Sequence, residues 1–217
     1  MFAQTYAKYY DLMNQDKHYK KEIEFVYKWA DKPLSILDIG CGTASYWKYY
    51  PTSTYIKGFE RSMPMGKMST ALPRKELITI GDVTTSKFSF LPFDCSTALF
   101  DVINYIPKHD WWKNLPLKKG GYFIFDIWDK EKVDKMGFRM TIKAKGGITR
   151  IINPLRYDGK SVKLNVTLSN SDFEETELHT MYVYSEKDIK KFCGKQFEIV
   201  DKKETKTWQT WLKLKRK

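Results

Sequence analysis

The stretch Ser35–Ala44 places the tightest constraint on how this chain folds. Its residues 36–39, Ile-Leu-Asp-Ile, form a nearly continuous apolar run, which is typical of a parallel strand covered on both faces. Gly40 and Gly42 follow at once and predict a tight turn, where the backbone approaches a ligand closely. We expect residues 45–50 to begin a helix, whose free N–H groups would face that ligand. The stretch therefore predicts a ligand site at the end of a buried strand.

Strands and helices alternate around this stretch. Apolar spacing typical of a helix runs through residues 6–30, with a break expected at 14–16. Residues 87–92 are too short and irregular for a helix, so one crossover is expected to be abbreviated. The alternation predicts an α/β fold with a Rossmann-like, doubly wound, mostly parallel sheet. The remaining elements predicted in this part are strands at 55–59, 77–80, 93–100 (running on to 105) and 122–127, helices at 63–71 and 108–115, and a turn at 118–121.

The pattern changes after this sheet. Between residues 138 and 184 apolar and polar residues alternate, which predicts an antiparallel β-rich insert. A length of 217 residues fits one domain, so we expect a single domain over residues 1–217 that contains the insert 138–184. The last predicted elements are a helix at 185–192, capped by Ser185 and Asp188, and strands at 197–201 and 207–214.

Two acidic residues close the strands that follow the glycine turn. Glu60 lies at the end of the second strand, about 20 residues beyond the turn, where nucleotide-binding folds place a carboxylate that accepts hydrogen bonds from ribose hydroxyls. Asp82 closes the third strand, and such strand ends carry ligands in open parallel sheets. An ordinary strand-end charge is the alternative for Glu60, and the upstream glycine turn favours the ribose role.

Taken in order, these motifs resemble those of the class I S-adenosylmethionine-dependent methyltransferases. Residues 37–43 look like the cofactor turn of that family, 58–60 like its ribose acid, 81–82 like its adenine contact, and 117–125 like its fifth strand with the preceding turn. The resemblance would cover almost the whole chain. It departs from the family at Ala44, which stands where the third glycine of the turn is usual.

One subgroup of the family looks closer. Residues 6–12, 98–105 and 123–128, followed by a β-rich insert, are similar to small-molecule methyltransferases that include amino-sugar N-methyltransferases and relatives of the glycine N-methyltransferases. This resemblance implies a small acceptor, such as an amine of a nucleotide-linked sugar. The insert would then be a lid, an acceptor pocket or a dimer surface.

The resemblance implies S-adenosyl-L-methionine as the cofactor and a set of residues that surround it. Tyr6 and Tyr10 would close over the cofactor and line the acceptor pocket, although a core aromatic stripe is an equal alternative. The other residues implied are Asp38, Gly40, Cys41 and Gly42 around the methionine part, Glu60 at the ribose, Arg61 nearby, Asp82 and Val83 at the adenine, and Leu99 and Phe100 near the sulfonium.

No motif identifies a general base. If the acceptor is an amine, it must be neutral when it attacks, and a carboxylate or a histidine can accept its proton. The candidates are Asp126, at the end of the fifth strand, and His179, in the insert. Asp126 alternatively binds substrate or caps the strand, and His179 alternatively faces solvent.

Composition bears on partners and location. The net charge of +12 favours anionic partners, but the lysines are scattered along the chain, so a solvated lysine-rich surface is favoured over a nucleic-acid surface. No stretch approaches the ~20 apolar residues of a membrane span, and no secretory signal is visible, so we expect a cytoplasmic protein that does not bind membranes. The three cysteines lack metal-site spacing, so no metal is expected, and Cys41 is assigned to packing.

Two other functions stay open. The basic charge also suits a nucleic-acid or protein methyltransferase, but residues 104–107 read Asn-Tyr-Ile-Pro, not the Asp/Asn-Pro-Pro-Tyr of adenine or glutamine N-methyltransferases. A non-catalytic member that uses the fold for binding or as a scaffold is the second alternative. The chain is expected to be a monomer or a homodimer.

Overall fold

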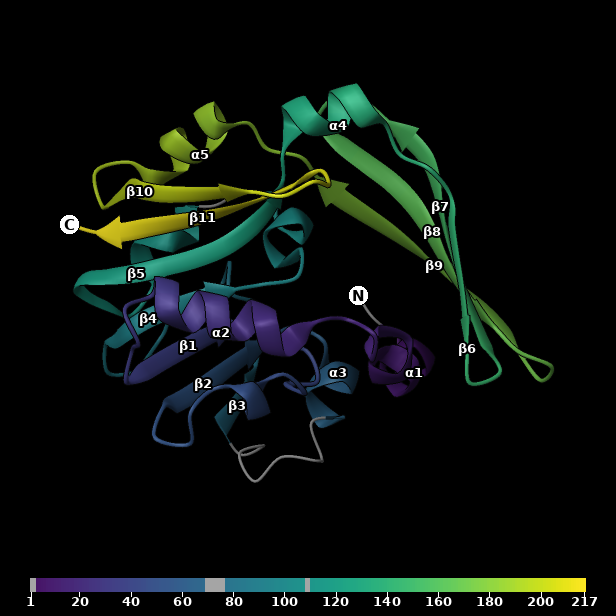
Figure 1. Ribbon diagram of the computed structural model, residues 1–217, viewed down its shortest axis with the longest axis horizontal. Helices are drawn as coiled ribbons and strands as arrows, with labels where there is room; N and C mark the ends of the chain where they lie inside the picture. Colours follow the sequence, from purple (N-terminus) through teal and green to yellow (C-terminus); the bar gives the residue numbers. More distant parts are fainter. Residues whose placement is uncertain (1–2, 69–76, 108–109) are drawn as a thin grey trace.

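Two β-sheets organise the chain, as Figure 1 shows. The structure is a computed structural model that describes residues 3–68, 77–107 and 110–217. In the described residues the larger sheet has seven strands in the order β10-β11-β5-β4-β1-β2-β3. Strands β1 to β5 are parallel, and β11 runs antiparallel to both β5 and β10. These strands are β1 (Ser35–Ile39), β2 (Tyr55–Glu60), β3 (Ile78–Ile80), β4 (Phe93–Ala98), β5 (Leu117–Trp128), β10 (Phe197–Glu204) and β11 (Gln209–Arg216). The predicted Rossmann-like, mostly parallel sheet is therefore confirmed.

The N-terminal part forms two helices, α1 (Gln4–Asn14) and α2 (Tyr19–Trp29), which confirms the predicted break between them. In α2 the buried residues are Tyr19, Ile23 and Val26, at the spacing of one helix face. This face packs on the larger sheet, in a core cluster that includes residues of β1, β2 and β5. Figure 1 shows α2 lying across the strands of the larger sheet, whereas α1 lies beside α3 (Met63–Lys67).

Several crossovers are shorter than predicted. Residues 45–50 do not begin an α-helix, because only the 3₁₀ turn η1 (Trp47–Tyr49) forms there. Helix α3 (Met63–Lys67) covers the first part of the helix predicted at 63–71, and residues 69–71 lie outside the described residues. The helix predicted at 108–115 is the 3₁₀ segment η5 (Asp110–Asn114), and residues 108–109 are likewise not described. No helix forms at the described residues 87–92, as predicted.

The prediction for strand β5 was too short. The strand begins at Leu117 and runs through the residues predicted to form a turn. The residues predicted to form a turn instead interrupt the register of β5 against β4, and Gly120 among them has a φ of +78°. The predicted extension of β4 to residue 105 is instead the 3₁₀ segment η4 (Val102–Tyr105).

The second sheet is the predicted antiparallel insert. It has four strands in the described residues, in the order β6-β7-β8-β9, and Figure 1 shows it beside the larger sheet. A short helix that the sequence pattern did not predict, α4 (Lys130–Met136), leads into it. Its four strands are β6 (Thr141–Lys145), β7 (Ile148–Tyr157), β8 (Ser161–Ser169) and β9 (Glu174–Tyr182).

The chain returns to the larger sheet through helix α5 (Glu186–Cys193). Ser185 and Asp188 form the predicted capping box at its start, each accepting a hydrogen bond from the backbone N–H of the other. Among the described residues, no helix is long and apolar enough to cross a membrane.

Candidate functional site

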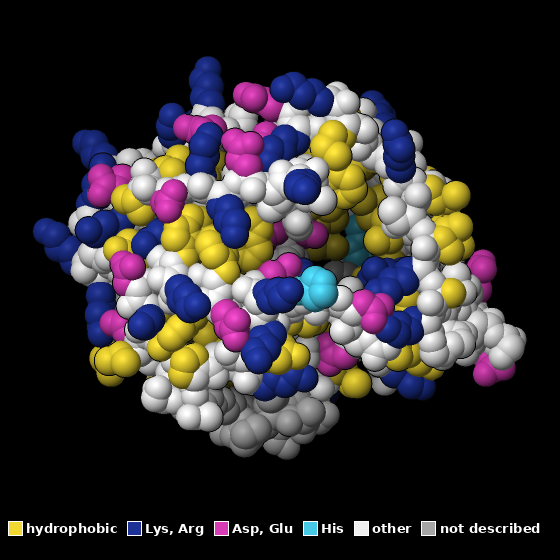
Figure 2. Space-filling model, viewed as in Figure 1, with side chains coloured by type: hydrophobic (Ala, Val, Ile, Leu, Met, Phe, Trp, Pro, Cys, Tyr) yellow, Lys and Arg dark blue, Asp and Glu magenta, His cyan; other side chains and the backbone are white. Residues whose placement is uncertain are grey.

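A cavity of about 750 Å³ lies between the carboxyl ends of β1, β2 and β4, the helix α1 and the inner face of the insert. Figure 2 shows the surface hollowed at this place, with hydrophobic side chains along its wall. Of the predicted site residues, those that line the cavity are Tyr6, Tyr10, Gly40, Cys41, Gly42, Glu60, Arg61, Asp82, Val83, Leu99, Phe100 and His179. The two predicted residues absent from its lining are Asp38 and Asp126.

The glycine turn gives the cavity its backbone wall. Gly40 and Gly42 both adopt positive φ angles, of 65° and 57°. A Cβ atom at Gly40 would lie 2.5 Å from a methyl carbon of Val102, so the close approach also requires glycine there. Ala44 has a φ of 55° and is fully buried. The third position of the turn is thus held in the left-handed region although it is not glycine.

Asp38 does not face the cavity as expected. Its Oδ2 accepts hydrogen bonds from the Tyr46 hydroxyl at 2.7 Å and from the Trp47 indole N–H at 2.6 Å, and its Oδ1 accepts one from Thr97 at 2.8 Å. Burial raises the pKa of Asp38 to about 6, although these hydrogen bonds oppose the rise. The carboxyl group therefore anchors the segment behind the turn from inside the core.

Glu60 lies where the ribose acid was predicted. Its Oε2 accepts a hydrogen bond from the Gly42 N–H at 2.8 Å, and its Oε1 accepts one from the Ser62 N–H at 2.6 Å. Burial raises the pKa of Glu60, and the backbone N–H groups work against that rise. A carboxylate has about four acceptor positions, so Glu60 can bond to the turn and still accept hydroxyl groups from the cavity.

Asp82 lies farther along the same rim. It accepts hydrogen bonds from the Thr84 N–H at 2.9 Å and the Thr84 hydroxyl at 2.7 Å, and its Oδ2 lies 3.3 Å from Nε of Arg61. Burial alone would raise the pKa of Asp82, but these hydrogen bonds and the guanidinium outweigh it and lower the pKa below its usual value. Asp82 is therefore an ionised acceptor at neutral pH.

Asp126 lies beneath the cavity, 1% exposed, and does not have the access of a base. Its two oxygens accept hydrogen bonds from the Phe100 N–H at 2.7 Å and the Asp101 N–H at 3.0 Å. Both of those residues have positive φ angles, of 67° and 68°. Burial and the neighbouring Asp101 raise the pKa of Asp126. The prediction of a base is thus corrected, because the carboxyl group holds a left-handed loop at the cavity floor.

His179 lines the cavity and is 3% exposed, so the alternative that it faces solvent is wrong. Its Nδ1 lies 3.0 Å from the Tyr105 hydroxyl, and its Nε2 lies 3.3 Å from Oε2 of Glu177. Burial lowers the pKa of His179, against the raising effect of the Glu177 charge. The imidazole is therefore neutral at pH 7, with Nδ1 placed to accept a hydrogen bond from Tyr105 and with Nε2 close to the Glu177 carboxylate.

Tyr6 and Tyr10 project from α1 into the cavity, with their ring centroids 6.0 Å apart. Burial raises the pKa of both hydroxyls, so both stay protonated. Tyr6 also belongs to the apolar cluster on the inner face of the insert, as the alternative of an aromatic packing stripe expects. Burial also raises the pKa of Cys41 well above its usual value, which keeps this thiol unreactive.

The sequence pattern missed two important cavity residues. Tyr105 comes from the 3₁₀ segment that follows β4, and Arg150 comes from β7 of the insert. The signal for Arg150 was its place in the alternating run Ile148–Ile152, but alternation does not tell which face of a strand turns inward. Among the described residues, no three His, Cys, Asp or Glu side chains gather in a way that could hold a metal ion.

Comparison with solved structures shows the same architecture in known proteins. An S-adenosylmethionine-dependent methyltransferase from Clostridium acetobutylicum is 22% identical, with a TM-score of 0.78 and 96% of each chain covered. CalS10, an amino pentose methyltransferase from Micromonospora echinaspora solved with S-adenosylmethionine bound, is 16% identical, with a TM-score of 0.72, and the match covers 100% of this chain and 98% of that one. The sugar N-methyltransferase KedS8 from Streptoalloteichus is 14% identical, with a TM-score of 0.74. That match covers 94% of this chain and 90% of the KedS8 chain.

No protein-family model and no curated protein sequence matches the chain. The likeness therefore rests on structure, and it extends over both sheets because the matches cover nearly the full length. In the larger sheet, β11 lies antiparallel between β5 and β10. The chain has the fold of the class I S-adenosylmethionine-dependent methyltransferases.

Proposed function

We propose that this protein transfers a methyl group from S-adenosylmethionine to an amine of a small molecule. The observation that carries the proposal is one cavity that joins the glycine turn and Glu60 to a second wall built by the insert, where His179 lies. The solved structures of similar fold support a small acceptor, because they include an amino pentose methyltransferase and a sugar N-methyltransferase.

The residues of the cavity fit this cofactor. The close approach at Gly40 leaves a backbone wall without side chains, as a methionine moiety requires. Glu60 offers acceptors for ribose hydroxyls, and Asp82 and Val83 lie along the rim for the adenine. Leu99 and Phe100 then contribute the apolar surface beside the sulfur. These assignments place successive parts of the cofactor against successive strand ends of the larger sheet.

When bound, the cofactor supplies a methyl group on a sulfonium; the lone pair of the acceptor amine forms a bond to the methyl carbon, and the electrons of the broken C–S bond stay on sulfur. The protein aligns the acceptor with that carbon, and such alignment contributes roughly 7–11 kcal/mol to catalysis in well-oriented systems. The proton released by the new ammonium passes to the Tyr105 oxygen while the Tyr105 proton moves to Nδ1 of His179. Glu177, 3.3 Å from Nε2, stabilises the imidazolium that forms.

Further parts of the proposal come from the sequence. We infer that residues 1–217 act as one domain, with the insert 138–184 as the wall of the acceptor pocket. We also infer a cytoplasmic protein that acts as a monomer or a homodimer, without a metal.

Isothermal titration with S-adenosylmethionine and S-adenosylhomocysteine tests the cofactor assignment directly. We expect micromolar dissociation constants, and binding no tighter than millimolar would contradict the proposal. Transfer of a labelled methyl group to a panel of amines, hydroxyl compounds and nucleotide sugars tests catalysis. Cofactor binding without turnover of any acceptor would favour a non-catalytic binding protein.

A further inference from the structure

One wall of the cavity is formed by the inner face of the insert and is mostly apolar. A guanidinium on such a wall is costly unless an oxygen-rich partner satisfies it. Among the described residues, Arg150 and His179 are the ionisable ones that the insert contributes to the cavity lining. The other insert residues in the lining are Ile152, Leu164, Val166 and Met181.

Among the residues that the structure describes, the hydrogen-bond partners of Arg150 are neutral and lie at long distances. Its Nη1 lies 3.5 Å from the Tyr6 hydroxyl and 3.4 Å from Oδ1 of Asn14. These are weak hydrogen bonds for a group with five N–H donors. Arg150 is half-buried, so its charge is partly removed from water.

The acids on the elements around Arg150 bond elsewhere. On β9, Glu175 accepts from the Thr5 hydroxyl, and Glu177 accepts from the Ala3 N–H and lies beside the His179 ring. Asp16, after α1, pairs with the Lys143 and Lys145 ammonium groups of β6. The surrounding carboxylates are therefore committed to holding α1 on the insert.

We propose that Arg150 binds an oxyanion of the methyl acceptor, so that the acceptor is an amine that also carries a carboxylate or a phosphate. This inference rests on the proposed function and specifies its substrate class. A guanidinium presents a planar fork that matches a carboxylate or a phosphate with two parallel hydrogen bonds. The Tyr6 hydroxyl and the Asn14 side chain stand beside the fork as additional polar contacts.

The position of Tyr6 relates this anion site to the proton path. Its hydroxyl lies 3.5 Å from Arg150, and its ring centroid lies 6.3 Å from that of His179. The two ionisable residues that the insert contributes to the cavity lining, Arg150 and His179, therefore both lie near the Tyr6 side chain. An acceptor held by its oxyanion at Arg150 directs its amine along Tyr6 toward the Tyr105 hydroxyl, which contacts His179 at 3.0 Å.

Matched acceptor pairs test the inference on the wild-type protein. Each pair has an acidic amine and a neutral counterpart of similar size: glycine and glycinamide, β-alanine and β-alaninamide, O-phosphoethanolamine and ethanolamine. We expect the acidic member of at least one pair to have a kcat/KM at least about 10²-fold higher, because the neutral member leaves the half-buried cation without an anionic partner. Preference in the amide pairs identifies a carboxylate, and preference in the last pair identifies a phosphate. Equal or better turnover of every neutral member overturns the inference.

A binding experiment decides the matter even if no probe amine is turned over. We expect acetate or inorganic phosphate, at millimolar concentration, to raise the melting temperature of the protein saturated with S-adenosylhomocysteine. The shift should disappear in Arg150→Met and be partly kept in Arg150→Lys, which retains the charge without the fork. Arg156→Met, on the same strand but exposed, is the matched control and should keep the full shift.

The outcomes separate this inference from the proposed function. If S-adenosylhomocysteine binds to the wild-type protein and to Arg150→Met alike, but neither anion shifts the wild-type melting temperature more than that of Arg150→Met, only the role of Arg150 is overturned. If S-adenosylhomocysteine does not bind to the wild-type protein, the proposed function itself fails.

Discussion

Buried carboxyl groups on β1 and β5 shape this site without entering it. Asp38 holds the aromatic residues behind the glycine turn, and Asp126 holds the backbone of the loop at Phe100. In the sequence, an acid inside or at the end of a buried strand looks the same whether it points to a ligand or to the protein's own donors. Asp38 should therefore affect stability, whereas Glu60 and His179, which line the cavity, should affect function.

The raised pKa of Asp38 predicts a definite pH dependence of stability. The unfolded chain releases this proton near the usual pKa of 3.8, whereas the folded chain keeps it until about 6. Because the folded state binds more protons between these values, the contribution of Asp38 to the free energy of unfolding falls as the pH rises, by about 3 kcal/mol in all. This contribution is complete below about pH 3 and constant above about pH 7.

Asp38→Asn removes this titration. We expect the difference in unfolding free energy, wild type minus variant, to fall by about 3 kcal/mol between about pH 3 and about pH 7. Urea denaturation at several pH values measures it, with Asp172→Asn on an exposed turn as the control. A difference that is independent of pH would show that Asp38 ionises equally in both states.

Glu60 connects the glycine turn to the cavity, so its charge should matter for cofactor affinity. Glu60→Gln keeps the size but replaces an oxygen that accepts the Gly42 N–H or the Ser62 N–H with a donor. Hydrogen bonds to charged groups contribute about 1.5–3 kcal/mol, which corresponds to a loss of about ten- to a hundredfold in affinity. Titration with S-adenosylhomocysteine measures this, and the exposed Glu198→Gln should bind as the wild type does.

The lowered pKa of His179 predicts the acidic limb of the activity profile. The neutral imidazole accepts a proton, so kcat/KM should fall with decreasing pH below the usual histidine range. In His179→Gln this acidic limb should disappear, and kcat should be about 10²–10⁴-fold lower with any amine that the enzyme accepts. S-adenosylhomocysteine should still bind to the variant. His18→Gln, an exposed histidine, serves as the control. An unchanged profile in His179→Gln would assign the limb to another group.

At the scale of elements, helix α1 joins the two parts of the cavity. The Thr43 hydroxyl of the glycine turn donates to Asp11 of α1 at 2.7 Å. At the other end, the Ala3 N–H donates to Glu177 of β9 at 2.8 Å. The helix therefore contacts the cofactor turn and the insert at once, and it holds Tyr6 and Tyr10 over the cavity.

Weakening the link to the turn should loosen α1 over the cofactor. Thr43→Val preserves the shape and removes the hydrogen bond to Asp11, which costs about 1 kcal/mol and thus about fivefold in S-adenosylhomocysteine affinity. Hydrogen exchange of the α1 amides should quicken in parallel, whereas exchange in β4 should not change. Thr167→Val, whose hydroxyl bonds to Thr176 on the insert, is the control. Unchanged exchange in α1 would show that this bond does not hold the helix.

The elements themselves were predictable where apolar periodicity is strong, as in β1, β4 and the insert. The segment after the glycine turn was not, because Ala44 just before it is held in the left-handed region, and Tyr50, which precedes Pro51, is extended. Helix α4 has one buried residue and therefore almost no periodicity, although its Asp129 cap and Gly137 end were signals in the sequence.

At the scale of the whole molecule, the sequence motifs were sufficient to predict a mostly parallel sheet and to place the glycine turn, Glu60 and Asp82 at the ends of its strands. They could not place the insert over that edge, because its position depends on long-range contacts such as those of α1 with β6 and β7. For this reason the acceptor side of the cavity, with Arg150 and Tyr105, emerged only from the fold.

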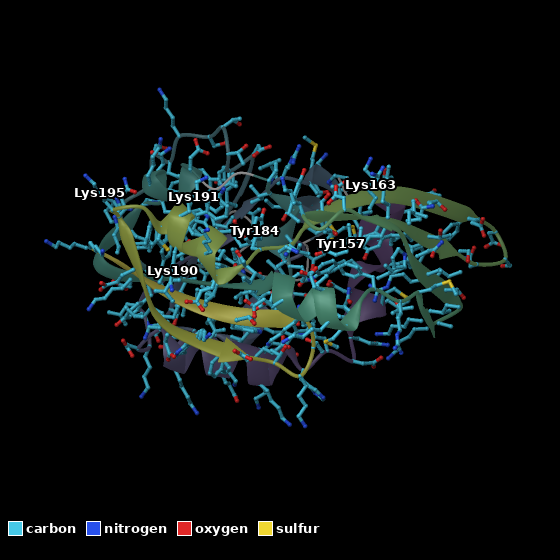
Figure 3. All side chains as sticks on the ribbon, turned by 90° about the horizontal axis from the view of Figure 1, so that it is seen from above. Tyr157, Lys163, Tyr184, Lys190, Lys191 and Lys195 are labelled. Atoms are coloured by element: carbon cyan, nitrogen blue, oxygen red, sulfur yellow. The ribbon has the colours of Figure 1, made fainter. Side chains whose placement is uncertain are left out.

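The distribution of charge over the whole surface bears on the choice between a small acceptor and a nucleic acid. The excess of 38 basic over 26 acidic residues is spread widely, as Figure 2 shows. In Figure 3, Lys191 and Lys195 lie near α5, whereas Lys163 lies on the insert, far from them. A nucleic-acid surface would instead concentrate its cations along one path.

Binding measured against salt separates these cases. We expect RNA and duplex DNA of mixed sequence to bind only weakly at physiological salt, with dissociation constants of about 10⁻⁴–10⁻⁶ M, and to lose affinity steeply as salt increases. Methyl transfer to a small amine should vary far less over the same range, because its contacts lie inside the cavity, where screening is weak. Tight binding of one nucleic-acid sequence, together with its methylation, would instead identify a nucleic-acid methyltransferase and would make the scattered lysines part of its substrate surface.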